Sequence, residues 1–133
     1  MKTGGCLCGA VRYRIDGALG GVYFCHCQQC RKAQGSAFVA SVPVAAEAFA
    51  LVAGEEFLRA YRSSPHKARH FCSVCGSPLF SRTDGAAQVR VRAGTLDEPS
   101  GLIAAAHIFV ADKASWDDIQ DALPRYPARE PGR

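Results

Sequence analysis

Seven cysteines in a chain of 133 residues constrain this protein more than any other feature of its sequence. Because seven is an odd number, a disulfide framework cannot pair all of them. They fall into three groups, which are Cys6-x-Cys8, Cys25-x-Cys27-x-x-Cys30 and Cys72-x-x-Cys75. Such local density is what metal ligation needs, since several sulfurs must lie about 2.3 Å from one ion. The pattern therefore predicts a zinc-binding protein.

The remaining composition predicts one compact domain over residues 1–123, followed by an extended tail over 124–133. A hydrophobic fraction of 48% is sufficient for one core, and no stretch approaches the length of a membrane helix. The first residues offer no apolar signal region, so we expect a cytoplasmic protein in which the thiols stay reduced. We expect no membrane partner, and the sequence leaves the oligomeric state open.

The charge balance is mild, with 16 basic and 12 acidic side chains and a net charge of +4. This balance indicates either an ordinary surface or a weak preference for anionic partners. The basic residues form no long run, and we expect no nucleic-acid partner.

Apolar patterning predicts a mainly β fold with one or two short helices. Seven strands are expected, over residues 11–15, 22–24, 38–42, 57–62, 78–82, 88–93 and 104–110. One short helix is expected over 45–49, with Pro43 in its first turn, and another over 115–123. Ser115 followed by Asp118 resembles a helix-start box, and we expect Trp116 to anchor that helix in the core.

The first and third cysteine groups are predicted to share one metal ion. Alternate residues of a strand face the same side, so Cys6 and Cys8 offer two sulfurs together. Cys72 and Cys75 lie on a zinc-knuckle turn, where Gly76 is free to adopt positive φ. Together they supply the four thiolates of a closed structural zinc site, on which folding should depend.

The second group then holds a second zinc ion with only three sulfurs. Cys25, Cys27 and Cys30 leave one coordination position for water or substrate, as in catalytic zinc sites. The alternative is a second structural site with a histidine as fourth ligand. His26 is a poor candidate because neighbouring side chains point apart, whereas three other histidines remain open as ligands: His66, His70 and His107. We expect His107, in an apolar strand, to be packed in the core, where it could bond to a metal ligand.

Four motifs in order resemble those of the glutathione-dependent formaldehyde-activating enzyme family, which also includes centromere protein V. They are Gly5-Cys6-x-Cys8-Gly9-Ala10-Val11-Arg12-Tyr13, Cys25-His26-Cys27-x-x-Cys30-Arg31-Lys32-x-x-Gly35-Ser36, Phe71-Cys72-x-x-Cys75-Gly76-Ser77 and Gly94-Thr95-Leu96-Asp97. Each motif alone is weak, but the four in this order are specific. The resemblance continues through His107 and Trp116, and so covers nearly the whole chain.

The resemblance implies a β-tent fold, in which two antiparallel sheets lean together over zinc knuckles. It implies two zinc ions per chain, structural on Cys6, Cys8, Cys72 and Cys75, and reactive on Cys25, Cys27 and Cys30. The implied activity is that of a carbon–sulfur lyase acting on a glutathione-like thiol and a small aldehyde such as formaldehyde, as in S-(hydroxymethyl)glutathione synthase. Only five residues precede Cys6, so we expect any substrate contact of the longer members' N-terminal extension to be missing.

Four side chains in these motifs are candidate substrate contacts, namely Arg31, Lys32, Ser36 and Thr95. For the two basic residues the alternative is a solvated turn, and for Ser36 and Thr95 it is a turn or capping role. Two other functions stay open for the whole chain. One is a non-catalytic zinc-binding interaction module, and the other is a thiol redox protein that uses the second cysteine group.

Overall fold

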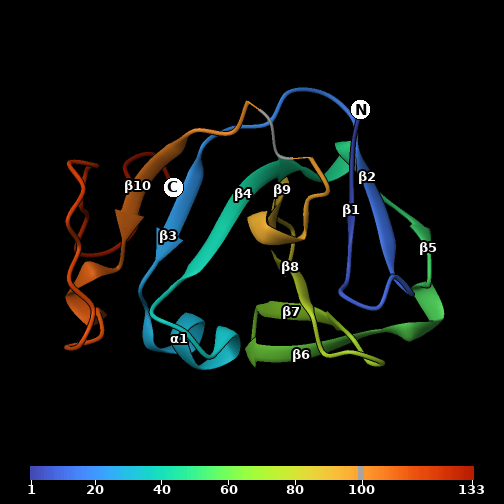
Figure 1. The fold of residues 1–133 in the computed structure, drawn as a ribbon, viewed down its shortest axis with the longest axis horizontal. Coiled ribbons are helices and arrows are strands. Elements are labelled where there is room, and N and C mark those ends of the chain that lie inside the picture. Colours follow the sequence, from blue (N-terminus) through green and yellow to red (C-terminus); the bar gives the residue numbers. More distant parts are fainter. Residues whose placement is uncertain (99–100) are drawn as a thin grey trace.

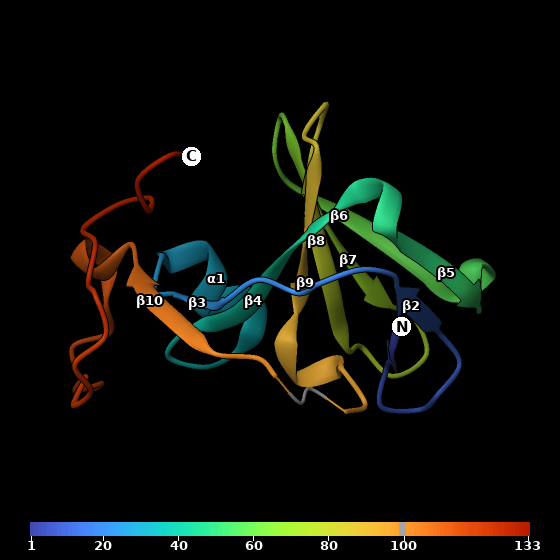
Figure 2. The same ribbon diagram turned by 90° about the horizontal axis from the view of Figure 1, so that it is seen from above.

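The structure, a computed structural model, describes residues 1–98 and 101–133, which form two β-sheets and one α-helix (Figure 1). The smaller sheet is antiparallel, in the order β1 (Lys2–Gly5), β2 (Arg12–Ile15), β5 (Phe49–Ala53). The larger sheet has the order β10 (Ala104–Ile108), β3 (Val22–Cys25), β4 (Val39–Ala45), β9 (Gln88–Arg92), β8 (Pro78–Thr83), β7 (Lys67–Cys72), β6 (Leu58–Ser64). In Figures 1 and 2 the smaller sheet lies at one end of the molecule, and β10 lies at the other.

The prediction of a mainly β fold with two sheets and few short helices is confirmed. Each of the seven expected strands is present, with ends shifted by a few residues. The sheets are antiparallel except for one pair, because β10 runs parallel to β3. The sequence patterns did not predict β5 or β7, and β7 carries three basic side chains that mask its alternation. The N-terminal strand β1 ends at Gly5, before the two cysteines that a strand was expected to carry.

The core lies between the two sheets and is built by strand alternation. In β9 the sequence Gln-Val-Arg-Val-Arg turns Val89 and Val91, 2% and 0% exposed, toward the core. Tyr13 and Ile15 of β2 face them from the smaller sheet and are also fully buried. The arginines of β9 therefore lie on the opposite face of the larger sheet, away from this core.

The helix α1 (Gln28–Gln34) connects β3 to β4 and is defined at both ends by the chain itself. The sulfur of Cys27 caps its first turn by accepting the amide N–H of Cys30 at 3.3 Å. Gly35 ends it with a φ of 67°, and its N–H donates to the carbonyl of Arg31 at 2.8 Å. This helix keeps Cys27 and Cys30 on one short, rigid segment.

The prediction of a helix over 45–49 is wrong, because a strand and a short turn occupy this region instead. Pro43 lies within β4, and only one 3-10 turn forms, at Ala46–Ala48. In β4 the residue opposite Pro43 is Arg90 of β9. The strand continues through Pro43 because its neighbours Val42 and Val44 are both buried in the core.

The predicted helix over 115–123 is absent, and Trp116 is 73% exposed instead of anchoring the core. Polar side chains satisfy the backbone here in place of a helix: Arg125 donates to the carbonyls of Ile119 and Asp121, at 2.9 and 3.1 Å. Asp121 also accepts the amide N–H of Leu123 at 3.0 Å. These bonds compete with helical ones.

The last residues run beside β10. The amide of Tyr126 donates to the carbonyl of His107 at 2.9 Å, and Phe109 donates to Ala128 at 3.0 Å. This contact covers an otherwise open edge of the larger sheet. No helix within residues 1–98 and 101–133 has the length and apolar character needed to span a membrane.

Candidate metal centres

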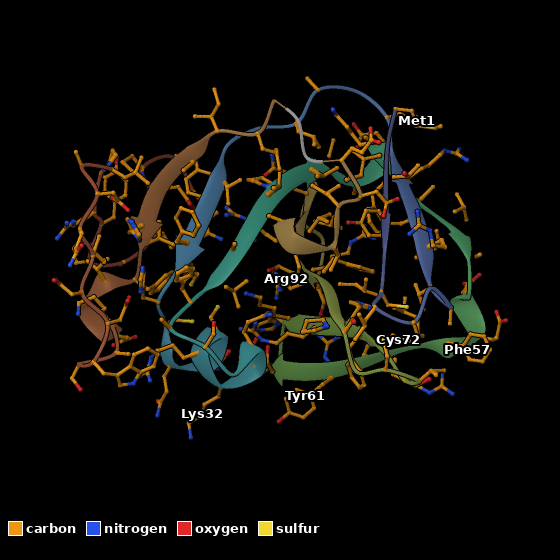
Figure 3. All side chains as sticks on the ribbon, in the orientation of Figure 1. Met1, Lys32, Phe57, Tyr61, Cys72 and Arg92 are labelled. Carbon is orange, nitrogen blue, oxygen red and sulfur yellow. The ribbon has the colours of Figure 1, made fainter. Side chains whose placement is uncertain are left out.

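Four cysteines converge at the foot of the smaller sheet, and we call them the knuckle cluster: Cys6, Cys8, Cys72 and Cys75. Their sulfurs all lie within 4.8 Å of one another. Cys6 and Cys8 lie in the turn between β1 and β2, and Cys72 ends β7 just before the turn that carries Cys75. Figure 3 shows Cys72 below the lower end of β1. The cluster thus joins the two sheets.

The backbone at Cys6 and Cys8 differs from the expected strand. The amide of Gly9 donates to the carbonyl of Cys6 at 3.1 Å, and Gly9 has a φ of 80°. The two sulfurs therefore meet on a tight turn rather than on one face of a strand. The other turn matches the expectation, since Gly76 has a φ of 79° and donates to the carbonyl of Cys72 at 2.8 Å. Both halves of the cluster are knuckles.

The sulfur spacing in the knuckle cluster fits a tetrahedral zinc site. The sulfurs of Cys6 and Cys8 lie 3.6 Å apart, and those of Cys8 and Cys72 lie 3.9 Å apart. Zinc–sulfur bonds of about 2.3 Å imply tetrahedron edges of about 3.8 Å. The residues present therefore fit zinc in both donor type and geometry.

Hydrogen bonds from the surrounding chain favour the thiolate at two of the four cysteines, Cys6 and Cys75. The amide of Val11 donates to the sulfur of Cys6 at 3.2 Å. The hydroxyl of Ser77 lies 3.2 Å from the sulfur of Cys75, and with the amides of Cys8 and Ser77 it lowers the pKa of Cys75 to about 5. Stabilised thiolates are the ligands that zinc requires.

The second group, which we call the cleft cluster, contains Cys25, Cys27 and Cys30. Cys25 ends β3, Cys27 caps α1, and Cys30 lies in the first turn of that helix. Their sulfurs also lie within 4.8 Å of one another, and Cys30 is 4% exposed. All three come from six consecutive residues, whereas the knuckle cluster draws on two distant turns.

The cleft cluster is electrostatically frustrated without a cation. The sulfurs of Cys27 and Cys30, together with burial, raise the pKa of Cys25 far above its usual value. The pKa of Cys30 is instead lowered to about 2, by the sulfurs of Cys25 and Cys27 and then by Arg69. The guanidinium of Arg69 donates to the sulfur of Cys30 at 3.7 Å. Three thiols this close cannot all ionise unless positive charge joins them, and a divalent ion fits that requirement.

Within the described residues, no histidine nitrogen joins the cleft cluster. His26 is fully buried, with Nε2 at 2.8 Å from Nδ1 of His107. The other ring nitrogen of His107 lies 2.9 Å from a carboxylate oxygen of Asp121. His107 is thus a packed core histidine, as expected, and it bonds His26 rather than a cysteine. These contacts hold the loop between Cys25 and Cys27 from behind.

The cleft cluster borders a cleft of about 810 Å3 on the face of the larger sheet opposite the core. Alternate residues of three adjacent strands form its polar wall, with Arg69 opposite Ser81 and Ser81 opposite Arg90 across the sheet. The cationic side chains that line it are Lys67, Arg69, Arg90, Arg92, Arg129 and Arg133. Asp112 is the acidic side chain in the lining.

Sequence reasoning missed this wall, although a signal was present in the strict alternation of residues 88–92 and in Lys67-x-Arg69. The buried valines of β9 fix one face as core, so the arginines between them must share the other face. What the sequence did not show was that β7 is a strand and lies two strands from β9.

The four predicted substrate contacts lie elsewhere. Arg31 and Lys32 are on α1 but are not part of the cleft lining, and Figure 3 shows Lys32 projecting from α1 away from Arg92. The hydroxyl of Ser36 donates to the carbonyl of Phe38 at 2.7 Å, and that of Thr95 lies 2.7 Å from the hydroxyl of Tyr13. Their contact with substrate stays a prediction without support from the cleft lining.

Two comparisons with known proteins agree with this arrangement. Residues 1–112 match the family model described as glutathione-dependent formaldehyde-activating enzyme, and this span contains all seven cysteines. A crystal structure of a Rhodobacter sphaeroides protein superposes with a TM-score of 0.63 at 22% sequence identity. That match covers 77% of this chain and 97% of the other, and it establishes a shared fold.

Proposed function

The chain belongs to the glutathione-dependent formaldehyde-activating enzyme family, and we propose that it is a zinc-dependent carbon–sulfur lyase-like enzyme. Its substrates would be a small-molecule thiol of the glutathione type and a small aldehyde such as formaldehyde. In the forward direction the thiol sulfur bonds to the aldehyde carbon, the carbonyl double bond becomes single, and the thiol proton ends on the oxygen. The product is an S-hydroxymethyl adduct, and the reverse reaction cleaves the same carbon–sulfur bond.

The observation that carries this proposal is a cluster of three thiols, with no fourth protein ligand among the described residues, on the wall of a cleft. We propose one zinc ion there and a second, structural zinc ion in the knuckle cluster. When bound in the cleft, zinc lowers the pKa of a coordinated substrate thiol, so that the nucleophilic thiolate exists near neutral pH.

The chain's own residues orient the cleft cluster. The amide of Cys30 holds the sulfur of Cys27 at 3.3 Å, and Arg69 holds the sulfur of Cys30. Val39 and Ile108, 1% and 2% exposed, pack against the cysteines and exclude water from one side of them. A substrate therefore approaches from the cleft, where Cys27 is partly exposed.

Zinc content and exchange kinetics test the proposal together. We expect two zinc ions per chain and an accelerated NMR exchange between formaldehyde and its glutathione adduct, with Cys30→Ser as the inactive comparison. Two zinc ions without acceleration for any thiol would favour a non-catalytic interaction module. A thiol redox protein would be favoured by a different result. Catalysis would then change with the oxidation state of the three cleft thiols and would continue after the zinc ion of the cleft cluster is removed.

A further inference from the structure

We propose that Lys67, Arg69 and Arg92 form an anion-binding subsite in the cleft, which selects thiols that carry a carboxylate close to the sulfur. The inference rests on the proposed function for the identity of the reacting thiol, and it goes further by assigning the specificity of the cleft to three residues. All three side chains line the cleft beside the cleft cluster.

The first support is a buried guanidinium with unused donors. Arg69 is 8% exposed, and its Nε and Nη1 atoms are buried without a hydrogen-bond partner. Burying such donors unpaired costs free energy that an anionic ligand would offset. Only Nη2 of Arg69 is engaged, at 3.7 Å from the sulfur of Cys30.

The second support is the absence of internal counter-charges. Within residues 1–98 and 101–133, no carboxylate lies within ion-pair distance of these three side chains, whereas Glu130 bridges the outer pair Arg90 and Arg133. Burial, and then the neighbouring Arg69, lower the pKa of Arg92 to about 10. The cleft therefore has an outer cationic pair that shares one carboxylate and an inner cationic trio that has none within ion-pair distance.

The charges of the inner region also leave room for an anion. Three thiolates and one divalent ion sum to −1, and the three cations add +3, which leaves +2. A thiol that contributes one thiolate and one carboxylate supplies −2 and balances the site.

The position of Arg69 sets how far the carboxylate lies from the substrate sulfur. One guanidinium nitrogen is 3.7 Å from the sulfur of Cys30, which is about the distance between two sulfurs on one zinc ion. Cys30 would therefore neighbour both the zinc ion and Arg69, and a short thiol acid could place its sulfur on the ion and its carboxylate on the free donors of Arg69. The chain of 3-mercaptopropionate meets this requirement.

The test compares 3-mercaptopropionate with the neutral, isosteric 3-mercaptopropionamide on the zinc-loaded full-length chain. Isothermal titration calorimetry gives the Kd of each thiol, and we expect the acid to bind about tenfold more tightly, as for one hydrogen-bonded charge pair. The preference should weaken as salt is raised. It should shrink in Lys67→Met and Arg69→Met and stay unchanged in Arg14→Met, which removes one exposed charge from the smaller sheet.

The outcomes separate the subsite from the proposed reaction. Equal Kd values for acid and amide in the unsubstituted protein would overturn the subsite, even if both thiols exchange rapidly with formaldehyde. If Arg14→Met abolished the preference for the acid as fully as Lys67→Met, that would also overturn the subsite, since the overall charge of the protein would then be the cause. A preference lost only in the cleft variants, with no formaldehyde exchange, would support the subsite and refute the proposed reaction.

Discussion

The knuckle cluster and the cleft cluster use the same ligand atom in opposite settings. The knuckle cluster takes its sulfurs from two turns 64 residues apart and ties the smaller sheet to the larger one. The cleft cluster takes its sulfurs from one short segment, against a cationic wall and an open cleft. A metal ion that closes a long loop stabilises the fold. An ion bound by one short segment stabilises the fold little, so its site can serve catalysis instead.

Substituting a knuckle ligand should have the largest effect. In Cys72→Ser we expect loss of the cooperative thermal transition in circular dichroism. Cys72 is fully buried, and structural zinc binding of about 10 kcal/mol or more is comparable with the whole stability of a small domain. A melting temperature within a few degrees of that of the unsubstituted protein would show that the knuckle cluster does not stabilise the fold more than the cleft cluster does.

Substituting a cleft ligand should separate activity from folding. In Cys30→Ser we expect zinc content to fall from two ions to one and adduct exchange to slow at least about 100-fold, because one of three metal-holding thiolates is lost. The far-ultraviolet spectrum and thermal transition should persist. Joint loss of both zinc ions would contradict the independence of the clusters.

Chelation should remove the two ions in sequence. A site with three protein ligands holds its ion less tightly than a site with four, so the cleft ion should leave first. We expect titration with a chelator to give a stable species with one zinc, folded and inactive, before unfolding begins. Parallel loss of metal and structure along one curve would refute this order.

The sequence predicted those features of the two clusters that depend on the spacing of cysteines and glycines along the chain. Ligand count and the glycine after Cys75 pointed to a four-and-three division, and the sulfur distances agree with it. The helix expected after Ser115 failed because aspartate and arginine side chains bind the backbone there. The cationic wall could not be predicted because it depends on the order of β7, β8 and β9 in the sheet.

Removing a supporting hydroxyl should have the smallest effect. The hydroxyl of Ser77 accepts the amide of Leu7 at 2.9 Å and lies beside the sulfur of Cys75. In Ser77→Ala we expect the free energy of unfolding to fall by about 1–2 kcal/mol, with exchange activity unchanged. Ser115→Ala, at an exposed position outside both clusters, serves as the control in the same urea titration. A decrease in activity without a decrease in stability would reverse the roles assigned to the two clusters.

Anomalous diffraction at the zinc edge tests the central claim most directly. The account predicts two peaks per chain: one about 2.3 Å from each of Cys6, Cys8, Cys72 and Cys75, and one at that distance from Cys25, Cys27 and Cys30 with a fourth, non-protein ligand facing the cleft. A disulfide among the knuckle cysteines, or a fourth protein ligand on the cleft ion, would contradict it.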